Sequence, residues 1–425
     1  MKSISHSIAV FSLTALSLVA FSGCAVKEVG KGRAVGSVLD YDLRRTPKSG
    51  VKVASPKPSE KPDPAEDSAN LLLPLTSFAS FSLHTGPINA LAVGADGLKL
   101  YTGGEDGRVV LTTLTGPNPL ASGSSEQLFQ GPKPILALAL SPDGKQLAIA
   151  RFSVVFVVDL ETHQLVASQD SLEGRISALS WDPRGEYLAI GRANGDVFLW
   201  GLAVASGPSA NRLESYRGAT SPIESIRFHP DGAVIFVAPQ SGGINVWRLI
   251  RTERELGTRS DGQVGSRVLE GGKRVVIDSL AARLEDIWLS DDGSELFTAA
   301  ADGQVYSWQV RGLVARSAVP VSSVNLYGLA GASKEARAAL ALNSSAELIA
   351  VSDRESRVSL LCGVAGLLQL FAQSPAFDQP LTQLLMSSEG STLWGIQKTG
   401  NLVGFDLRLL AKLPNSKNTL DRCKG

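Results

Sequence analysis

The chain has 425 residues, 41 basic and 41 acidic side chains, 44% hydrophobic residues and only three cysteines. Its 42 glycines and 21 prolines are too few for a low-complexity chain, so the composition predicts a globular protein. A net charge of zero without a long basic run excludes the phosphate attraction that non-specific nucleic-acid binding requires. The four histidines and three cysteines are scattered, so we expect no metal site.

Residues 1–23 are predicted to be an export signal. Lys2 supplies the positive start, Ile8 to Phe21 form an apolar stretch too short for a permanent membrane span, and Ser22-Gly23-Cys24 follows. The segment Phe21-Ser22-Gly23-Cys24 resembles the lipobox of bacterial lipoproteins, which implies that Cys24 is diacylated and becomes the mature N-terminus. An ordinary signal peptide with an incidental cysteine is the alternative.

The lipoprotein resemblance also implies a place in the cell. Ala25 stands where an aspartate favours inner-membrane retention in enterobacterial lipoproteins, so we expect the outer membrane, with the protein facing the periplasm. Residues 24–74 contain six prolines among Lys, Glu, Asp and Ser, a composition that buries too little apolar surface to fold. They are predicted to be a disordered, lipid-anchored tether.

A repeated turn organises the rest of the chain. Seven copies of a Ser/Asp/Gly-rich turn occur, and in six of them a second turn follows ten residues later. Asp-Gly and Asn-Gly between apolar runs are strong hairpin signals, because both residues tolerate positive φ. The first turns are centred on Gly97, Gly144, Gly185, Gly232, Gly293, Ala346 and Gly390.

Each copy predicts a four-stranded antiparallel sheet. Large rings recur five residues after the second turn, at Trp200, Trp247, Trp308 and Phe405, which suits face-to-face packing of sheets. Residues 76–83 precede the first copy and are expected to supply the outer strand of the seventh sheet, beside residues 401–407. The predicted fold class is all-β: a seven-bladed β-propeller over residues 75–408, with a C-terminal tail at 409–425.

These repeats resemble the WD40 family of β-propellers from about Thr76 to Leu407. In the first copy His84, Thr102 and Asp106 occupy the positions of the family's structural hydrogen-bond network, and Thr112 replaces its tryptophan. The resemblance implies that His84 is a buried structural histidine and not a catalyst.

We expect no catalytic residue and no cofactor. The sequence has no nucleophile elbow, dinucleotide fingerprint, Walker loop or His-Glu-x-x-His motif. Among the inner-strand positions that would face a central channel, only Glu224 and Glu285 are acidic. The competing hypothesis is a propeller enzyme of the lactonase or hydrolase kind, which would act on a small molecule or sugar in that channel.

In WD40 relatives, partners commonly contact the face formed by the starts of the inner strands and the turns between second and third strands. The resemblance therefore implies a partner-binding rim here, which mixes charge with one aromatic ring and suits a protein partner. The rim comprises Asn89, Glu105, Phe152, Arg175, Glu224, Gln240, Glu285, Arg354 and Lys398. We expect a monomeric, non-catalytic scaffold that binds envelope proteins.

Two cysteines remain besides Cys24. An exported domain lies in an oxidising compartment, where thiols within reach of each other tend to be joined. The sequence predicts a disulfide between Cys362 and Cys423, which would fix the tail. The alternative is that Cys362 packs as a small apolar residue.

Overall fold

The structure, a computed structural model, describes residues 73–77, 79–115, 123–170, 172–202, 213–217, 219–252, 268–277, 282–315, 320–326, 339–343, 347–353, 356–364 and 367–412. The chain divides into two units, Met1–Pro64 and Ala65–Gly425, and all of these residues belong to the second. The predicted signal peptide, the predicted lipidation site Cys24 and nearly all of the predicted tether lie outside the described residues.

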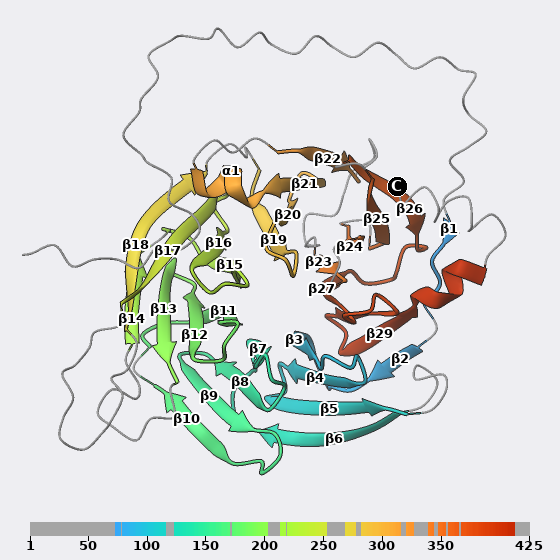
Figure 1. Cartoon of the computed structure of the whole chain (residues 1–425). Coiled ribbons are helices and arrows are strands. Elements are labelled where there is room, and N and C mark those ends of the chain that lie inside the picture. Colours follow the sequence, from blue (N-terminus) through green and yellow to red (C-terminus); the bar gives the residue numbers. More distant parts are fainter. Residues whose placement is uncertain are drawn as a thin grey trace, which may run out of the picture. The chain divides into compact units, whose positions relative to one another are not determined.

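The second unit is an all-β propeller whose seven sheets, or blades, follow one another around a ring (Figure 1). Each blade contains four antiparallel strands, an inner, a second, a third and an outer strand, and blade six has one strand more. The inner strands are β3 (Ile88–Val93), β7 (Ala137–Leu140), β11 (Ile176–Trp181), β15 (Ile223–Phe228), β19 (Leu284–Leu289), β23 (Ala339–Leu342) and β27 (Leu381–Met386). The second strands are β4 (Lys99–Gly104), β8 (Gln146–Arg151), β12 (Tyr187–Arg192), β16 (Val234–Pro239), β20 (Glu295–Ala300), β24 (Leu348–Ser352) and β28 (Thr392–Gln397).

The outer half of each blade completes the sheet. The third strands are β5 (Arg108–Leu114), β9 (Val154–Asp159), β13 (Asp196–Gly201), β17 (Ile244–Thr252), β21 (Gln304–Gln309), β25 (Val358–Val364) and β29 (Asn401–Asp406). The outer strands of blades one to six are β6 (Gly123–Gln130), β10 (Leu165–Gln169), β14 (Leu213–Arg217), β18 (Val268–Ile277), β22 (Ser322–Asn325) and β26 (Leu367–Gln373). A short helix, α1 (Val310–Ala315), which the sequence did not predict, follows β21.

The N-terminal segment closes the ring at two blades. The outer strand of blade seven is β2 (Ala79–Ser82), which pairs antiparallel with β29, as expected from the missing outer strand. The preceding strand β1 (Leu73–Pro74) pairs parallel with β26 and gives blade six a fifth strand, which the sequence did not predict. Packed structure therefore begins before the predicted boundary at 75, and the 3₁₀ helix η1 (Leu407–Lys412) carries it past the boundary at 408.

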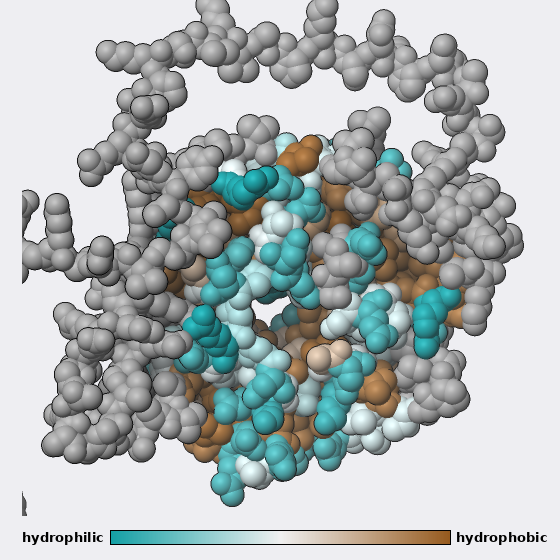
Figure 2. Space-filling view, in the orientation of Figure 1, coloured by the Kyte–Doolittle hydropathy of each residue, from teal (hydrophilic) through white to brown (hydrophobic). Residues whose placement is uncertain are grey.

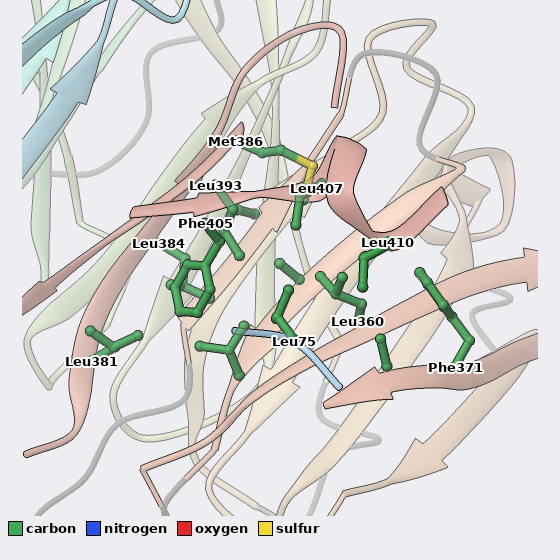
Figure 3. Packing of buried hydrophobic residues seen from close by; sticks show 14 of the residues in the cluster. Leu75, Leu360, Phe371, Leu381, Leu384, Met386, Leu393, Phe405, Leu407 and Leu410 are labelled. Carbon is green, nitrogen blue, oxygen red and sulfur yellow. The ribbon is translucent and has the colours of Figure 1, made fainter. Parts of the chain in front are cut away.

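The core consists of layers between blades. Among the described residues, one cluster of buried hydrophobic side chains lies at each of the seven blade-to-blade seams. The predicted rings take part: Trp200, Trp247, Trp308 and Phe405 are at most 3% exposed, each in a different cluster. At the seam of blades six and seven, Leu75 from the N-terminal segment packs with Leu407 and Leu410 from η1 (Figure 3).

The hairpin turns between second and third strands follow the predicted chemistry. Gly107, Gly195, Gly242, Gly303 and Gly400 all have positive φ, and at Gly107 an added Cβ would lie 2.1 Å from the carbonyl oxygen of Gly131. Glycine is therefore required there, because it alone combines this backbone conformation with the close approach of the next segment.

Candidate functional site

A central cavity of about 520 Å³ opens among the inner strands, and every blade contributes to its lining. Figure 2 shows it as a hollow bordered on several sides by hydrophilic side chains. Its volume lies within the range of sites that hold a small molecule or a few inserted side chains.

A repeated irregularity of the inner strands helps to form this lining. In blades one, three, four, five and seven, the pairing of inner and second strands shifts register after the first residue of the inner strand. The residue inside each shift lines the cavity; these residues are Asn89, Ser177, Glu224, Glu285 and Thr382. A β-bulge leaves one residue unpaired in the ladder, and its side chain is free to face the channel.

Six of the nine predicted rim residues line the cavity, namely Asn89, Arg175, Glu224, Gln240, Glu285 and Lys398. Glu105 is joined to this group because the side-chain amide of Asn89 donates to its carboxylate at 2.9 Å. Phe152 lies outside the lining, and Arg354 lies outside the described residues. The structure thus gathers most of the rim around one opening, while its binding role stays a prediction.

The two acidic side chains considered as an enzyme pair differ in environment. Glu285 is 6% exposed and accepts a hydrogen bond of 2.7 Å from the guanidinium of Arg283. Glu224 is half-buried and also lines the cavity. Glu285 is thus engaged by a neighbouring arginine side chain at hydrogen-bond distance.

Phe152 is the aromatic residue of the rim. It lies in the turn between β8 and β9, where its φ of 43° is unusual for a bulky residue, and its side chain is 50% exposed. The ammonium of Lys133 lies 5.3 Å from the ring centroid. A bulky residue in this backbone region costs about 1 kcal/mol, and such strain is more frequent at functional sites.

Four side chains deeper in the cavity were missed by the sequence analysis: Arg227, Asp286, Trp288 and Gln383. Asp286 accepts from the backbone N–H of Leu340 at 3.0 Å, and Gln383 accepts from that of Leu91 at 2.9 Å. Both occupy the third position of an inner strand and bind the inner strand of the next blade. A polar residue in an otherwise apolar inner strand is the sequence signal that could have found them.

The network predicted for blade one is present. Nδ1 of His84 lies 2.9 Å from Asp106, and Nε2 lies 2.9 Å from the hydroxyl of Thr102. Arg108 adds a side-chain hydrogen bond to Asp106 at 2.9 Å and another to the carbonyl of Leu83 at 2.9 Å. Burial works against ionisation of Asp106, but hydrogen bonds from His84, Arg108 and Thr85 outweigh it and lower its pKa from 3.8 to about 2.

Other features bear on the remaining sequence predictions. Within the described ranges, no group of three or more His, Cys, Asp or Glu side chains could hold a metal ion. No helix of the described part is long and apolar enough to cross a membrane.

Cys362 is buried and disulfide-bonded, so it does not pack as a free thiol. Cys423 lies outside the described residues, and its pairing with Cys362 stays a prediction.

Two family models match the chain. The WD domain, G-beta repeat, matches residues 75–112, and the anaphase-promoting complex subunit 4 WD40 domain matches residues 135–217. A chain in a crystal structure of the mitotic checkpoint complex aligns with a TM-score of 0.61, covering 84% of this chain and 99% of that chain. At 14% sequence identity, this likeness concerns the fold alone.

Relatives of known sequence match parts of the chain. Apoptotic protease-activating factor 1 of Danio rerio is 25% identical over 40% of this chain and 13% of that protein. The protein LST8 homolog of Drosophila melanogaster is 21% identical over 41% of this chain and 49% of that protein. An uncharacterized WD repeat-containing protein of Synechocystis is 32% identical over 28% of this chain and 32% of that protein. In each case less than two thirds of the relative is matched.

Repeats, strand topology and these matches agree: the chain contains WD40 repeats and folds into a seven-bladed β-propeller.

Proposed function

We propose that the protein is a non-catalytic scaffold, anchored by a lipid on Cys24 to the bacterial outer membrane and facing the periplasm, where its rim binds other envelope proteins. The observation that carries the binding role is the gathering of six rim residues around one cavity, with an exposed, strained Phe152 on the turn after β8. A strained backbone conformation and an exposed aromatic ring, both found at Phe152, are features of a binding surface on a rigid scaffold.

The comparisons support a scaffold. WD40 propellers similar to this chain act as platforms for protein–protein contacts, and the matching sequences include subunits of complexes. One is the target of rapamycin complex subunit LST8 of Bos taurus, 25% identical over 38% of this chain.

The anchor is supported by the Ser22-Gly23-Cys24 boundary. Two or three acyl chains hold a protein stably on a bilayer, whereas one chain binds it only marginally. Replacing Cys24 with alanine should release the protein from membranes or block its processing. A Cys24→Ala chain that fractionates and migrates like the unaltered protein would contradict lipidation.

Capture from detergent-solubilised envelope tests the binding role. A rim variant carrying Phe152→Gly, Arg175→Glu and Lys398→Glu should lose proteins that co-purify with the unaltered chain. The matched control carries Lys99→Glu and Lys145→Glu, which also reverse two exposed positive charges. Lys99 and Lys145 stand at or directly before the starts of strands β4 and β8, beside the first turns, whereas the rim lies at the ends of the second strands. If rim variant and control capture the same proteins in the same yield, the rim is not the binding surface.

A further inference from the structure

Arg227 lies inside the central cavity between two side chains of the next blade. It is the fifth residue of β15, and its guanidinium carbon is 4.3 Å from the ring centroid of Trp288. The side chain keeps 28% of its surface exposed, and it is part of the cavity lining. Stacking on an indole ring restricts the orientation of the planar guanidinium group and stabilises its charge.

The hydrogen-bond donors of Arg227 are incompletely used. Nη1 donates to the carbonyl of Ile226 at 3.1 Å, but Nε is buried and has no hydrogen-bond partner among the described residues. Nη2 lies 3.9 Å from the nearest oxygen of Asp286, which is beyond hydrogen-bond distance. A guanidinium group has five N–H donors, four of them on Nη1 and Nη2, so Arg227 retains Nη donors that can bind an acceptor that enters the cavity, while Nε stays buried.

Asp286 forms a long ion pair with Arg227 at 3.9 Å, but its oxygens accept hydrogen bonds from backbone N–H groups. One accepts from the N–H of Ile287 at 2.8 Å and the other from the N–H of Leu340 at 3.0 Å. Gln383, a neutral residue, makes the corresponding bond at the seam of blades seven and one. Asp286 therefore bonds the blade seam and lies at ion-pair distance from Arg227 without accepting a hydrogen bond from Nη2, so guanidinium donors stay available in the cavity.

The charges around Arg227 also define what can enter. Burial raises the pKa of Asp286, although the charge of Arg227 opposes this shift, and burial lowers the pKa of Arg227. At the mouth Arg175 and Lys398 are exposed cations, while Glu285 is paired with Arg283. A carboxylate has the single negative charge and planar shape that one guanidinium fork accepts. Asp286 and Glu224 in the lining repel any anion, and they repel a phosphate dianion more strongly than a carboxylate.

We propose that the central cavity binds a carboxylate, an Asp or Glu side chain that the protein partner inserts, through the unused donors of Arg227. This proposal rests on the proposed scaffold function and specifies the chemistry of the partner at the same rim. A free dicarboxylate has the same chemistry, so the experiment must separate the two sources.

The test follows the Nε–H resonance of Arg227 in the ¹⁵N-labelled full chain, assigned by its loss in Arg227→Lys. The probes are acetyl-Gly-Gly-Glu-Gly-Gly-amide, the same peptide with Gln in place of Glu, and free glutarate. We expect the Glu peptide to shift this resonance, the Gln peptide to leave it unchanged, and glutarate to bind more weakly than the Glu peptide. Arg227→Gln should weaken the Glu peptide about tenfold or more, while Arg175→Gln at the mouth should have a smaller effect.

Three results would overturn the proposal. Equal behaviour of the Glu and Gln peptides, or no shift with either, rules out a carboxylate site at Arg227. Glutarate that binds as tightly as the Glu peptide, or more tightly, shows a site for a small free acid and not for a partner side chain. Because the resonance is read in the unaltered chain, the test stands even if Arg227→Gln fails to fold. If Arg227→Gln still captures the same envelope proteins, the carboxylate proposal fails while the scaffold function remains.

Discussion

The indole N–H of Trp308 donates a hydrogen bond of 3.1 Å to the hydroxyl of Thr298 within blade five. Blade one contains the complementary part of the network, in which Thr102 is bonded to His84 and His84 to Asp106. Thr102 and Thr298 occupy the same position of their strands, and Thr112 stands where blade five has Trp308. Each of these two blades therefore contains only part of the hydrogen-bond network that would join a tryptophan, a threonine, a histidine and an aspartate.

Thr298→Val should destabilise the fold, because it removes the acceptor and leaves the buried indole N–H of Trp308 without that partner. An unsatisfied buried donor costs roughly 1–3 kcal/mol. The measurement is a double-mutant cycle in urea with Trp308→Phe, which removes the donor as well. We expect Thr298→Val to cost little in the Trp308→Phe background, and equal costs in both backgrounds would show that the hydrogen bond contributes nothing.

Asp106 should make stability depend on acid. Its pKa of about 2 in the folded protein lies below the ordinary 3.8, so its contribution is present above about pH 4 and is lost as pH falls towards 2. Solvent screening of this partly exposed group reduces the contribution to about 1 kcal/mol. The free energy of unfolding should therefore differ between the unaltered chain and Asp106→Asn at pH 7, and the difference should shrink between pH 4 and pH 2. A difference that is constant over this range would contradict the assignment.

Much of the fold could be predicted because its signals are local and repeated. Turn residues at a constant spacing gave the hairpins, and rings at one register, such as Trp200 and Trp308, gave the packing of neighbouring blades. The strand β1 escaped prediction for the opposite reason. Leu73 and Pro74 form a two-residue strand with no alternation to detect, and its parallel partner β26 lies about 300 residues away in the sequence.

The sequence predicted the residues at the mouth of the candidate site, but it did not predict the side chains that line the cavity further inside. Turn and strand-start positions located Asn89, Arg175 and Lys398, because these follow from counting along each repeat. The orientation of Arg227 depends on register shifts within the inner strands, since a bulge changes which later residues face the channel. Its position over Trp288 and near Asp286 also depends on how blades four and five pack, which no local pattern encodes.

Stepwise truncation should separate the predicted tether from the strands that close the ring. Deleting residues 25–70 should leave the melting temperature unchanged. Deleting 25–77 removes β1 together with Leu75, which is 1% exposed and bonded through its N–H to the carbonyl of Gln373. Burial of one leucine contributes about 2 kcal/mol, so this step should lower the melting temperature by roughly 4 °C or more.

Deleting 25–84 also removes β2 and exposes the edge of β29, so it should have the largest effect. Calorimetry of the three truncations beside the intact mature chain gives the comparison. Equal melting temperatures for the 25–70 and 25–84 truncations would contradict closure by the N-terminal segment.

The last prediction concerns the partner of Cys362. This residue is disulfide-bonded and 1% exposed, in the same core cluster as Leu75 and Leu410. If the bond joins Cys362 to Cys423, it ties the C-terminal tail to blade six, and Cys423→Ser should lower stability by about 2–4 kcal/mol. Thiol labelling of the unreduced, denatured chain provides the direct measurement, because a lipid on Cys24 would block the third cysteine. We expect no reactive thiol in the unaltered chain, two after reduction, and one in unreduced Cys423→Ser. A reactive Cys423 in the unreduced, unaltered chain would rule out this pairing.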